Sequence, residues 1–242
     1  MTRKIALVTG ATRGIGLETA RQLARNDVHV LLAGRDRAAA NDAAAKLRQE
    51  GLTVDAIALD VNDANGIAAA AKEVEAAHGR LDILVNNAGI LAEDPTKKPS
   101  QQPLDAWRKT FDTNLFGVVA VTQAFLPLLK KSPAARIVNV SSILGSLALH
   151  TDPGSGIYDF KIPAYDASKS ALNAWTVHLA HELRETPIKV NAVHPGYVKT
   201  DMNGGNGELD IPDGARSSVE LALIGADGPN GSFSHLGQTL PW

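Results

Sequence analysis

A tyrosine and a lysine four residues apart are the side chains of this sequence best suited to acid–base chemistry. Tyr165 and Lys169 lie at the start of a segment with helical spacing, so they share one face, one turn apart. A free tyrosine has a pKa near 10, and lowering that pKa to about 7 requires roughly 4 kcal/mol of preferential stabilisation of the phenolate. The Lys169 ammonium, together with the positive nicotinamide ring of an oxidised cofactor, can supply this stabilisation. The spacing alone is common, and most such pairs lie on a surface or pack in a core.

Two further polar residues can join this pair. Ser142 follows the apolar run 136–140 and brings a hydroxyl that can hold a substrate oxygen, although a serine there also serves as a turn or cap residue. Asn114 lies between apolar residues inside the long helical segment 104–129. It is either a core asparagine with satisfied hydrogen bonds or the site of a kink that holds water for a proton relay.

A glycine-rich turn, residues 9–16 with the sequence TGATRGIG, joins the first apolar run to a helical segment. Gly10 permits the tight turn, Gly14 lets the backbone approach a pyrophosphate, and Gly16 lets the helix pack close to a sheet. The spacing is G-x3-G-x-G rather than the commoner G-x-G-x-x-G. Its place between a strand and a helix predicts a dinucleotide-binding site. The residues of this turn expected to contact the cofactor are Gly10, Thr12, Arg13, Gly14, Ile15 and Gly16.

The end of the second apolar run indicates which dinucleotide fits. An acidic residue there would bind the adenosine ribose hydroxyls and repel a 2′-phosphate, but the run ends in Leu-Ala-Gly followed by Arg35. Arg35, and Arg13 in the glycine-rich turn, can both reach a 2′-phosphate, which guanidinium groups bind well. Asp36 is the counter-argument, but its side chain is expected to point away as the next helix begins. The pattern therefore favours NADP(H) over NAD(H), unless Arg35 is simply a solvated residue at a helix start.

Two more strand ends offer cofactor contacts. Asp60 closes the third apolar run, where its carboxylate can accept the adenine amino group, and Val61 beside it belongs to the same expected contact. Residues 86–89 close the fourth run with turn-forming residues where the chain must pass the cofactor. The expected contacts from this turn are Asn87, Ala88 and Gly89.

Short β-branched apolar runs alternate with alanine-rich helical segments along the chain. This alternation is typical of α/β proteins, in which repeated right-handed crossovers give a doubly wound parallel sheet (a Rossmann fold) covered by helices on both faces. The expected strands are 5–8, 28–33, 54–59, 83–85, 136–140 and 189–193, and the expected helices are 15–25, 37–50, 64–78, 104–129 and 164–184. No break in composition divides the chain, so residues 1–242 are expected to form a single domain.

Three segments rich in glycine and proline break this rhythm. They are residues 91–103, 145–163 and 202–214. Ligands of open α/β sheets bind outside the carboxyl ends of the strands, and each segment follows a strand directly or nearly so. The segments are therefore candidate walls of a substrate site, the alternative being tolerated surface insertions.

The composition describes an ordinary globular chain. Its 242 residues carry a formal net charge of −2 with 21% charged residues, a balance that gives no sign of a nucleic-acid or membrane partner. The absence of cysteine excludes thiol catalysis, thiolate metal sites and disulfides, and no metal site is expected. No apolar run approaches the roughly 18 residues needed to span a bilayer. The apolar run after Arg3 and Lys4 is too short for a secretory signal, so a cytoplasmic location is expected.

Taken together, these residues resemble the short-chain dehydrogenase/reductase family in both type and order. The motifs that carry the resemblance are Thr9-Gly10-x3-Gly14-x-Gly16, Asn86-Asn87-Ala88-Gly89, Asn114, Ser142, Tyr165-x3-Lys169 and Pro195-Gly196. The resemblance covers nearly the whole chain. It implies a catalytic tetrad of Asn114, Ser142, Tyr165 and Lys169.

The resemblance also implies a role for each of these residues. Tyr165 is expected to donate the proton, and Ser142 to polarise the carbonyl. Lys169 is expected to bind the nicotinamide ribose and tune Tyr165, while Asn114 supports a water relay. The contacts expected around the nicotinamide carboxamide are Pro195, Gly196, Val198 and Thr200.

A narrower resemblance, to the carbonyl reductases of the family, lies in the C-terminal third. It rests on residues 194–202, with the sequence HPGYVKTDM, on residues 213–216 and on the closing residues 240–242. It implies NADPH-dependent reduction of ketones, aldehydes or quinones by hydride transfer. Ser142 and Tyr165 stand further apart than is common in the family, yet the insert between them is much shorter than that of animal carbonyl reductases. The monomeric state of the animal carbonyl reductases therefore cannot be assumed for this chain, and a tetramer, a dimer and a monomer all stay open.

Two other functions stay open as well. One is a binding protein that senses NADP(H) and has lost the chemistry, although no member of the tetrad is missing here. The other is an enzyme that reduces the activated C=C bond of an enone, against which the intact Tyr165 argues. The expected partner is a small-molecule carbonyl or alcohol, and the sequence does not identify it further.

Overall fold

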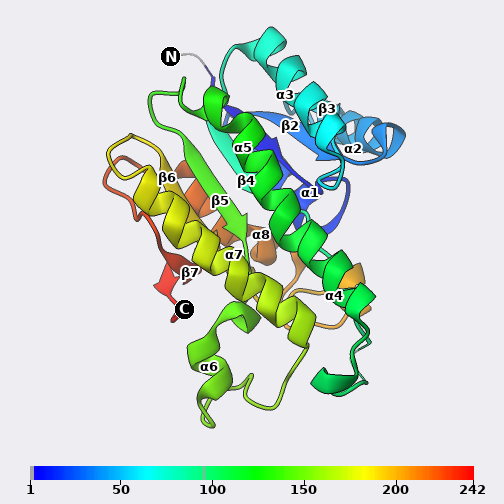
Figure 1. Ribbon diagram of the computed structural model, residues 1–242. Coiled ribbons are helices and arrows are strands. Elements are labelled where there is room, and N and C mark those ends of the chain that lie inside the picture. The colour runs from blue at the N-terminus through cyan, green and yellow to red at the C-terminus, as the bar shows by residue number, and fades with distance from the viewer. Residues whose placement is uncertain (1–2, 95) are drawn as a thin grey trace.

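Eight strands form the sheet at the centre of the computed structural model, which describes residues 3–94 and 96–242 (Figure 1). Their order is β3-β2-β1-β4-β5-β6-β7-β8, and all neighbours are parallel except β7 and β8. The strands are β1 Ile5–Val8, β2 His29–Gly34, β3 Val54–Ala58, β4 Ile83–Asn86, β5 Arg136–Val140, β6 Lys189–Val193, β7 Phe233–His235 and β8 Gln238–Thr239. The doubly wound parallel sheet predicted from the alternation is therefore confirmed.

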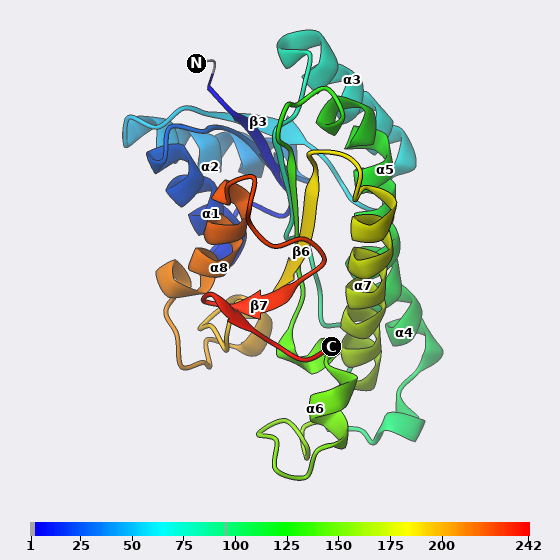
Figure 2. The same cartoon turned by 90° about the vertical axis from the view of Figure 1, so that its left-hand side faces the viewer.

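The helices cover both faces of this sheet, because its strands are nearly all apolar and buried. Figure 2 shows α1, α2 and α8 on one face and α3, α5 and α7 on the other, in agreement with the two hydrophobic clusters of the core. The helices are α1 Gly14–Arg25, α2 Arg37–Gln49, α3 Ala64–His78, α4 Leu104–Phe111, α5 Gly117–Leu129, α6 Leu147–Thr151, α7 Pro163–Glu182 and α8 Ile211–Leu223.

The strand order reverses between β1 and β4, and this point decides where a ligand fits. Val8 of β1 pairs with Leu32 on one side and with Val85 of β4 on the other. Helices that follow β1 and β4 leave to opposite faces, so the carboxyl ends of these strands border a crevice. The residues singled out in the sequence follow the ends of β1 to β6 and therefore meet at this edge of the sheet.

The helical segment predicted for 104–129 is interrupted at the residue that suggested a kink. α4 ends at Phe111, a π-helical turn spans Asp112–Phe116 around Asn114, and α5 continues from Gly117. Taken as one stretch, Leu104–Leu129 is long and apolar enough to cross a membrane, with a mean hydropathy of 1.3. Half of its most apolar window is buried inside the fold, as in a core helix.

The end of the chain is more regular than predicted. The segment 202–214, expected to be a loop, ends in the first turn of α8, and β7 and β8 extend the sheet beyond β6. Pro212 stands in the first turn of α8, where a proline is tolerated, and a Cβ on Gly214 would lie 2.5 Å from Val198 Cγ2. These two residues suggest a turn in the sequence, but here they start a helix and let it pack closely.

The other two variable segments keep mostly irregular backbone. Residues 145–163 contain only the short helix α6, and 91–103 contain a single 3-10 turn at Pro99–Gln101. Residue 95 of the second segment lies outside the described residues, as do residues 1 and 2 of the predicted domain. In Figure 1 both segments lie below the carboxyl edge of the sheet.

Candidate active site

The turn between β1 and α1 presents an open, positively polarised helix end. α1 begins at Gly14, and the side chain of Arg13 at its N-cap position makes no capping hydrogen bond within the described part of the chain. Gly14 has a φ of 57°, and a Cβ placed on it would meet nothing within 4 Å. Free N–H groups and open space at a helix N-terminus fit the pyrophosphate of a dinucleotide.

The end of β4 holds this turn in place. Asn87 Nδ2 donates to the carbonyl oxygens of Thr9 at 2.9 Å and Gly10 at 3.2 Å, and the backbone N–H of Ala88 donates to Thr9 Oγ1 at 3.1 Å. A Cβ on Gly16 would lie 2.6 Å from the Gly10 carbonyl oxygen, so only glycine fits there. The structure therefore assigns Asn87 and Ala88 at least a supporting role for the glycine-rich turn.

The residues predicted to select the dinucleotide lie where β2 ends. Arg35 is exposed. The side chain of Asp36 caps α2 and accepts the backbone N–H groups of Ala38 at 2.8 Å and Ala39 at 3.1 Å. The prediction that Asp36 turns away as the helix begins is thus confirmed, and it leaves the end of β2 to the guanidinium of Arg35.

Arg13 has a partner that the sequence did not suggest. Its Nη1 lies 2.9 Å from Asp201 Oδ2, and both side chains are about three-quarters exposed (78% and 75%). Asp201 directly follows Thr200, so this ion pair links the glycine-rich turn to the segment after β6. A 2′-phosphate would have to compete with Asp201 for Arg13.

Asp60 and Val61 follow β3 at the same edge of the sheet. Asp60 Oδ1 accepts the backbone N–H of Asn62 at 2.9 Å, which shapes the turn and leaves the second oxygen uncommitted. Val61 is buried and packs against Gly117, where a Cβ would come within 2.9 Å of it. Both residues lie at the carboxyl edge of the sheet, and their contact with the adenine stays a prediction.

Asn114 is fully buried and forms three hydrogen bonds from the π-helical turn. Its Oδ1 accepts the N–H of Ile90 at 2.8 Å, and its Nδ2 donates to the Ile90 carbonyl at 2.9 Å and to Ser168 Oγ at 3.1 Å. Ser168 in turn donates to the Tyr165 carbonyl at 2.7 Å. π-helical turns often occur at functional sites. Here the turn binds the loop after β4 to the helix that carries the tyrosine.

Lys169 approaches the same place from α7. Its ammonium is buried and donates to the carbonyl of Val140 at the end of β5, at 2.7 Å. A Cβ on Gly89 would lie 3.7 Å from Lys169 Nζ and 3.5 Å from Asn114 Oδ1, so the two side chains converge on Gly89. Burial lowers the pKa of Lys169 to about 8.

Tyr165 lies one turn before Lys169, whose Nζ is 5.6 Å from the centre of the phenol ring. Burial raises the pKa of Tyr165 to about 12, an interaction with the Ser142 hydroxyl lowers it in part, and the charge of Asp166 adds to the increase. The chain's own groups therefore do not give the lowered pKa expected from the sequence, because desolvation of the phenolate prevails. Of the two causes expected to lower the pKa of Tyr165, the one that the chain itself does not contain is the positive charge of an oxidised nicotinamide ring.

Ser142 stands at the end of β5, two residues after Val140. It is buried, and its Oγ accepts the N–H of Leu144 at 3.2 Å, which begins a short 3-10 turn. The interpretation of Ser142 as a cap is thus confirmed, and its hydroxyl also interacts with Tyr165. Its role in holding a substrate oxygen stays a prediction. Ser142, Tyr165, Lys169 and Asn114 are all brought together at the carboxyl edge.

The segment after β6 is held by α8 and by its own turn. Gly196 has a φ of 92°, and Val198 is buried and bridges to Leu209. The N–H of Thr200 donates to Asn203 Oδ1 at 3.1 Å, and its hydroxyl lies 3.3 Å from the same atom. These contacts fix the backbone between Val198 and Thr200, next to Asp201, which pairs with Arg13 of the glycine-rich turn.

Sequence reasoning missed one residue that contacts this site. Glu93 is buried, and its carboxylate accepts the backbone N–H groups of Ala164 and Tyr165. In the sequence it is an acid within a polar loop, which is typical of a solvated side chain. No local pattern reveals that its partners lie 71 and 72 residues further along the chain.

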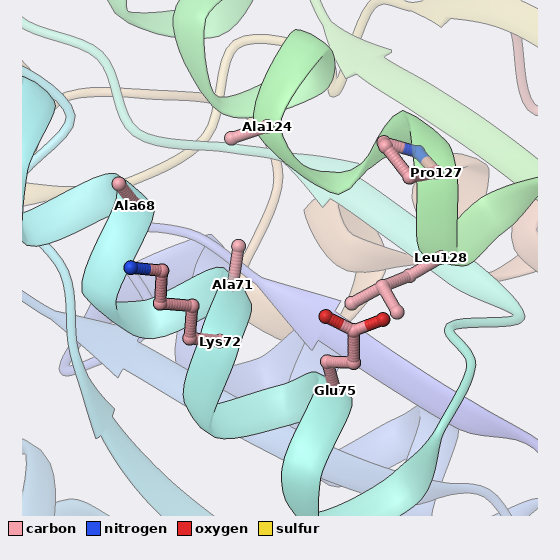
Figure 3. Close-up of a pocket in the computed structure, with 7 residues that line it drawn as sticks. All are labelled: Ala68, Ala71, Lys72, Glu75, Ala124, Pro127 and Leu128. Carbon is pink, nitrogen blue, oxygen red and sulfur yellow. The ribbon is translucent and has the colours of Figure 1, made fainter.

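A groove between α3 and α5 lies away from these residues (Figure 3). Its volume is about 250 Å³, and it is lined by Ala68, Ala71, Lys72, Glu75, Ala124, Pro127 and Leu128. None of the predicted site residues lines it. The carboxyl edge of the sheet, rather than this groove, remains the candidate active site.

Comparison with known proteins agrees with this geometry. The family model for short chain dehydrogenases matches residues 4–209. A short-chain dehydrogenase of Penicillium roqueforti is 38% identical over 93% of this chain and 91% of its own length. The (+)-neomenthol dehydrogenase of Arabidopsis thaliana is 35% identical over 96% of each chain. The NADPH-bound carbonyl reductase from chicken fatty liver superposes with a TM-score of 0.84 and 29% identity over 100% of each chain.

Proposed function

The chain belongs to the short-chain dehydrogenase family, and we propose that it is an NADP(H)-dependent carbonyl reductase in which Tyr165 donates the proton. The observation that carries the proposal is the convergence of four side chains beside the crevice. Tyr165 lies next to Ser142 and one turn from Lys169, while Asn114 and Lys169 meet at Gly89. The family's activity on hydroxyl and carbonyl groups supports the reaction class.

The protonation state of Tyr165 suits the reductive direction. With its pKa raised to about 12, the phenol is protonated at neutral pH and ready to act as an acid. The cofactor supplies the hydride for the carbonyl carbon. Ser142 holds and polarises the carbonyl oxygen, and Tyr165 passes its proton to that oxygen. The Lys169 ammonium binds the nicotinamide ribose and stabilises the phenolate as it forms.

Asn114 has a supporting place in this scheme. Its hydrogen bonds fix Ile90 and Ser168, and through Ser168 they reach the backbone carbonyl of Tyr165. We also propose that a relay of water molecules beside Asn114 and Lys169 returns a proton to Tyr165 after each turnover. The segments 91–103, 145–163 and 202–214 then form the walls of the substrate site.

Two features support NADP(H) as the cofactor. Arg35 is exposed at the end of β2, and Asp36 is engaged as the cap of α2, so no carboxylate repels a 2′-phosphate there. The structural neighbour from chicken fatty liver is described as NADPH-bound. A cytoplasmic location is a further expectation of the proposal, and a tetramer, a dimer and a monomer all stay open.

A panel assay tests reaction, cofactor and substrate class together. The purified protein is offered ketones, aldehydes, quinones and an enone, with NADPH and NADH side by side, and cofactor oxidation is followed at 340 nm. We expect NADPH-dependent formation of alcohols. Saturation of the enone C=C bond would favour the enone reductase, and inactivity on the whole panel with NADPH still bound would favour the NADP(H) sensor. NADH as the better cofactor would overturn the role given to Arg35.

A further inference from the structure

A buried glutamate far from α7 in sequence binds the backbone of the proposed proton donor. Glu93 lies in the segment 91–103 after β4, and only 6% of the residue is exposed. One carboxylate oxygen accepts the N–H of Ala164 at 3.0 Å, and the other accepts the N–H of Tyr165 at 2.5 Å. Both groups belong to the first turn of α7, where a helix cannot satisfy its own N–H groups.

This contact replaces a local cap. α2 and α3 begin directly after Asp36 and Asp63, whose side chains cap them. The corresponding residue of α7 is Ile162, which has no side-chain oxygen. A carboxylate at a helix N-terminus is favoured by the helix dipole as well as by its two hydrogen bonds. A distant segment therefore accepts the N–H groups of Ala164 and Tyr165, whereas the local side chain of Asp166 accepts the N–H of Ile162.

We propose that Glu93 is a positioning residue, which fixes the first turn of α7 so that the Tyr165 hydroxyl stays beside Ser142. It also ties that position to the segment 91–103, the wall proposed for the substrate. The inference rests on the proposed function, because it concerns the proton donor of that reaction. It adds a residue outside the Asn-Ser-Tyr-Lys set on which the reaction depends.

The cofactor-facing lysine has an anchor of its own. Lys169 Nζ donates to the carbonyl of Val140, which belongs to the central strand β5. Loss of Glu93 is therefore expected to displace Tyr165 more than Lys169. Misplacing a catalytic group by about 1 Å can cost about 100-fold in rate. Turnover should fall while the affinity for NADPH is kept.

Other charged groups lie close to the start of α7, and a variant of Glu93 should leave them unchanged. Asp166 accepts the N–H of Ile162 at 2.9 Å and lies 3.4 Å from His150 Nε2, while Lys161 Nζ lies 3.1 Å from His150 Nδ1. Glu93→Gln keeps the shape of the side chain and one acceptor oxygen. Glu93→Ala leaves two buried N–H groups without this acceptor, so it serves as the severe variant.

The kinetic experiment compares Glu93→Gln with Asp63→Ala, which removes the capping carboxylate of α3, a helix that carries none of the four proposed catalytic side chains. With the substrate found in the panel assay, Glu93→Gln should lower kcat about 10- to 50-fold and change the Kd of NADPH less than about twofold. Asp63→Ala should leave kcat unchanged, with thermal melts confirming that both variants are folded. An unchanged kcat in Glu93→Gln would overturn the proposal.

A double-mutant cycle with Tyr165→Phe separates positioning from a general loss of structure. If Glu93 acts through the phenol, Glu93→Gln should add less than about a twofold loss in single-turnover rate to the Tyr165→Phe enzyme. If instead the rate loss of the double variant equals the product of the two single losses, Glu93 does not act through Tyr165 and the proposal fails.

A pH titration of the Tyr165 phenol tests the positioning role of Glu93 even if no substrate is found. The chain has three tyrosines, so subtracting the Tyr165→Phe spectrum at 295 nm isolates Tyr165. Glu93→Gln should lower its midpoint by about one pH unit, because the phenol ring is less firmly buried once the first turn of α7 loses this contact. Asp166, Lys161, His150, Lys169 and Ser142 are unchanged in both forms. An unmoved midpoint overturns the positioning role, whereas an inactive wild type overturns only the proposed function.

Discussion

At the β1–α1 turn the candidate site presents backbone, whereas at the start of α7 it presents side chains. Around Gly14 the groups that can face a ligand are backbone N–H groups at the start of α1. Among the described residues, the N-cap residue Arg13 makes no side-chain capping bond there, and the space beside Gly14 is open. At α7 the reactive groups are a phenol and an ammonium, whose positions depend on hydrogen bonds to Glu93, Asn114 and Val140. The groups that face a ligand in the first region all come from one short stretch of chain, which Asn87 supports from the end of β4. In the second region, the reactive groups are held by residues from three other segments of the chain.

This difference predicts two kinds of response to substitution. A change in the β1–α1 turn should act on cofactor affinity, because binding is all that a backbone surface can offer. A change around α7 should act on turnover or on protonation, since binding there is shared among several segments. Each prediction below can break this division.

The largest effect is expected from Tyr165→Phe, which removes the proposed acid and keeps the ring. Turnover should fall by at least about 10³-fold, because the acid proposed to protonate the carbonyl oxygen is removed. The Kd of NADPH, measured by quenching of protein fluorescence, should stay within about twofold. A variant that retains most of its turnover would refute the role of the tyrosine, and one that loses cofactor affinity would erase the division between the two regions.

The same division explains what the sequence could predict. The strands, the glycine-rich turn and the direction of Asp36 follow from local rules of burial, backbone freedom and helix capping, and all three are seen in the structure. The interruption at Asn114 was also predictable, because a polar residue stood inside an apolar helical segment. What these features share is a cause within a few neighbouring residues.

The features that escaped prediction depend on distant partners. Glu93 had the pattern of a solvated loop residue until α7 was placed against it. Pro212 and Gly214 suggested a loop because a sequence does not show that Val198 requires a close approach. The pKa of Tyr165 was expected to fall through Lys169 together with the charge of an oxidised nicotinamide ring, and in the chain alone burial of the phenol raises that pKa.

A buried carboxyl next to Tyr165 should make stability depend on pH. Burial raises the pKa of Asp166 from 3.8 to about 7, and the charge of Glu93 adds to this increase. The folded state therefore keeps a proton that the unfolded chain has released, so the stability it contributes is present below pH 3.8 and lost as the pH rises through about 7. After allowance for partial solvent access, the loss is about 2 kcal/mol.

Asp166→Asn mimics the protonated carboxyl and should abolish this loss. Urea unfolding at pH 4 and pH 8 should show the variant gaining about 2 kcal/mol relative to the wild type at the higher pH. Because His150 Nε2 lies 3.4 Å from Asp166, the same comparison in a His150→Asn background checks that the difference comes from Asp166. An equal difference at both pH values would mean that Asp166 ionises normally in the folded state.

In the β1–α1 turn, Gly14→Ala should weaken NADPH binding about tenfold while leaving kcat at saturating cofactor nearly unchanged. The added methyl occupies the open space proposed for the pyrophosphate, and a φ of 57° adds backbone strain of about 1 kcal/mol. Gly51→Ala is the matched control, because Gly51 has a φ of 80° and equally open surroundings but lies at the end of α2. Equal effects of the two substitutions on the Kd would show that strain, and not the ligand, is responsible.

The smallest effect is expected at the edge of the β1–α1 turn, where Arg13 pairs with Asp201 of the segment after β6. Asp201→Asn frees the guanidinium for a 2′-phosphate and should raise the preference for NADPH over NADH, as a ratio of kcat/KM values, about threefold at low salt. Asp105→Asn, which breaks a similarly exposed pair with Arg108, should leave the ratio unchanged. Added salt screens exposed charges, so the gain should shrink above about 0.5 M. A ratio that does not rise would place the 2′-phosphate on Arg35 alone, and a fall in kcat would mean that this backbone-built region also governs turnover.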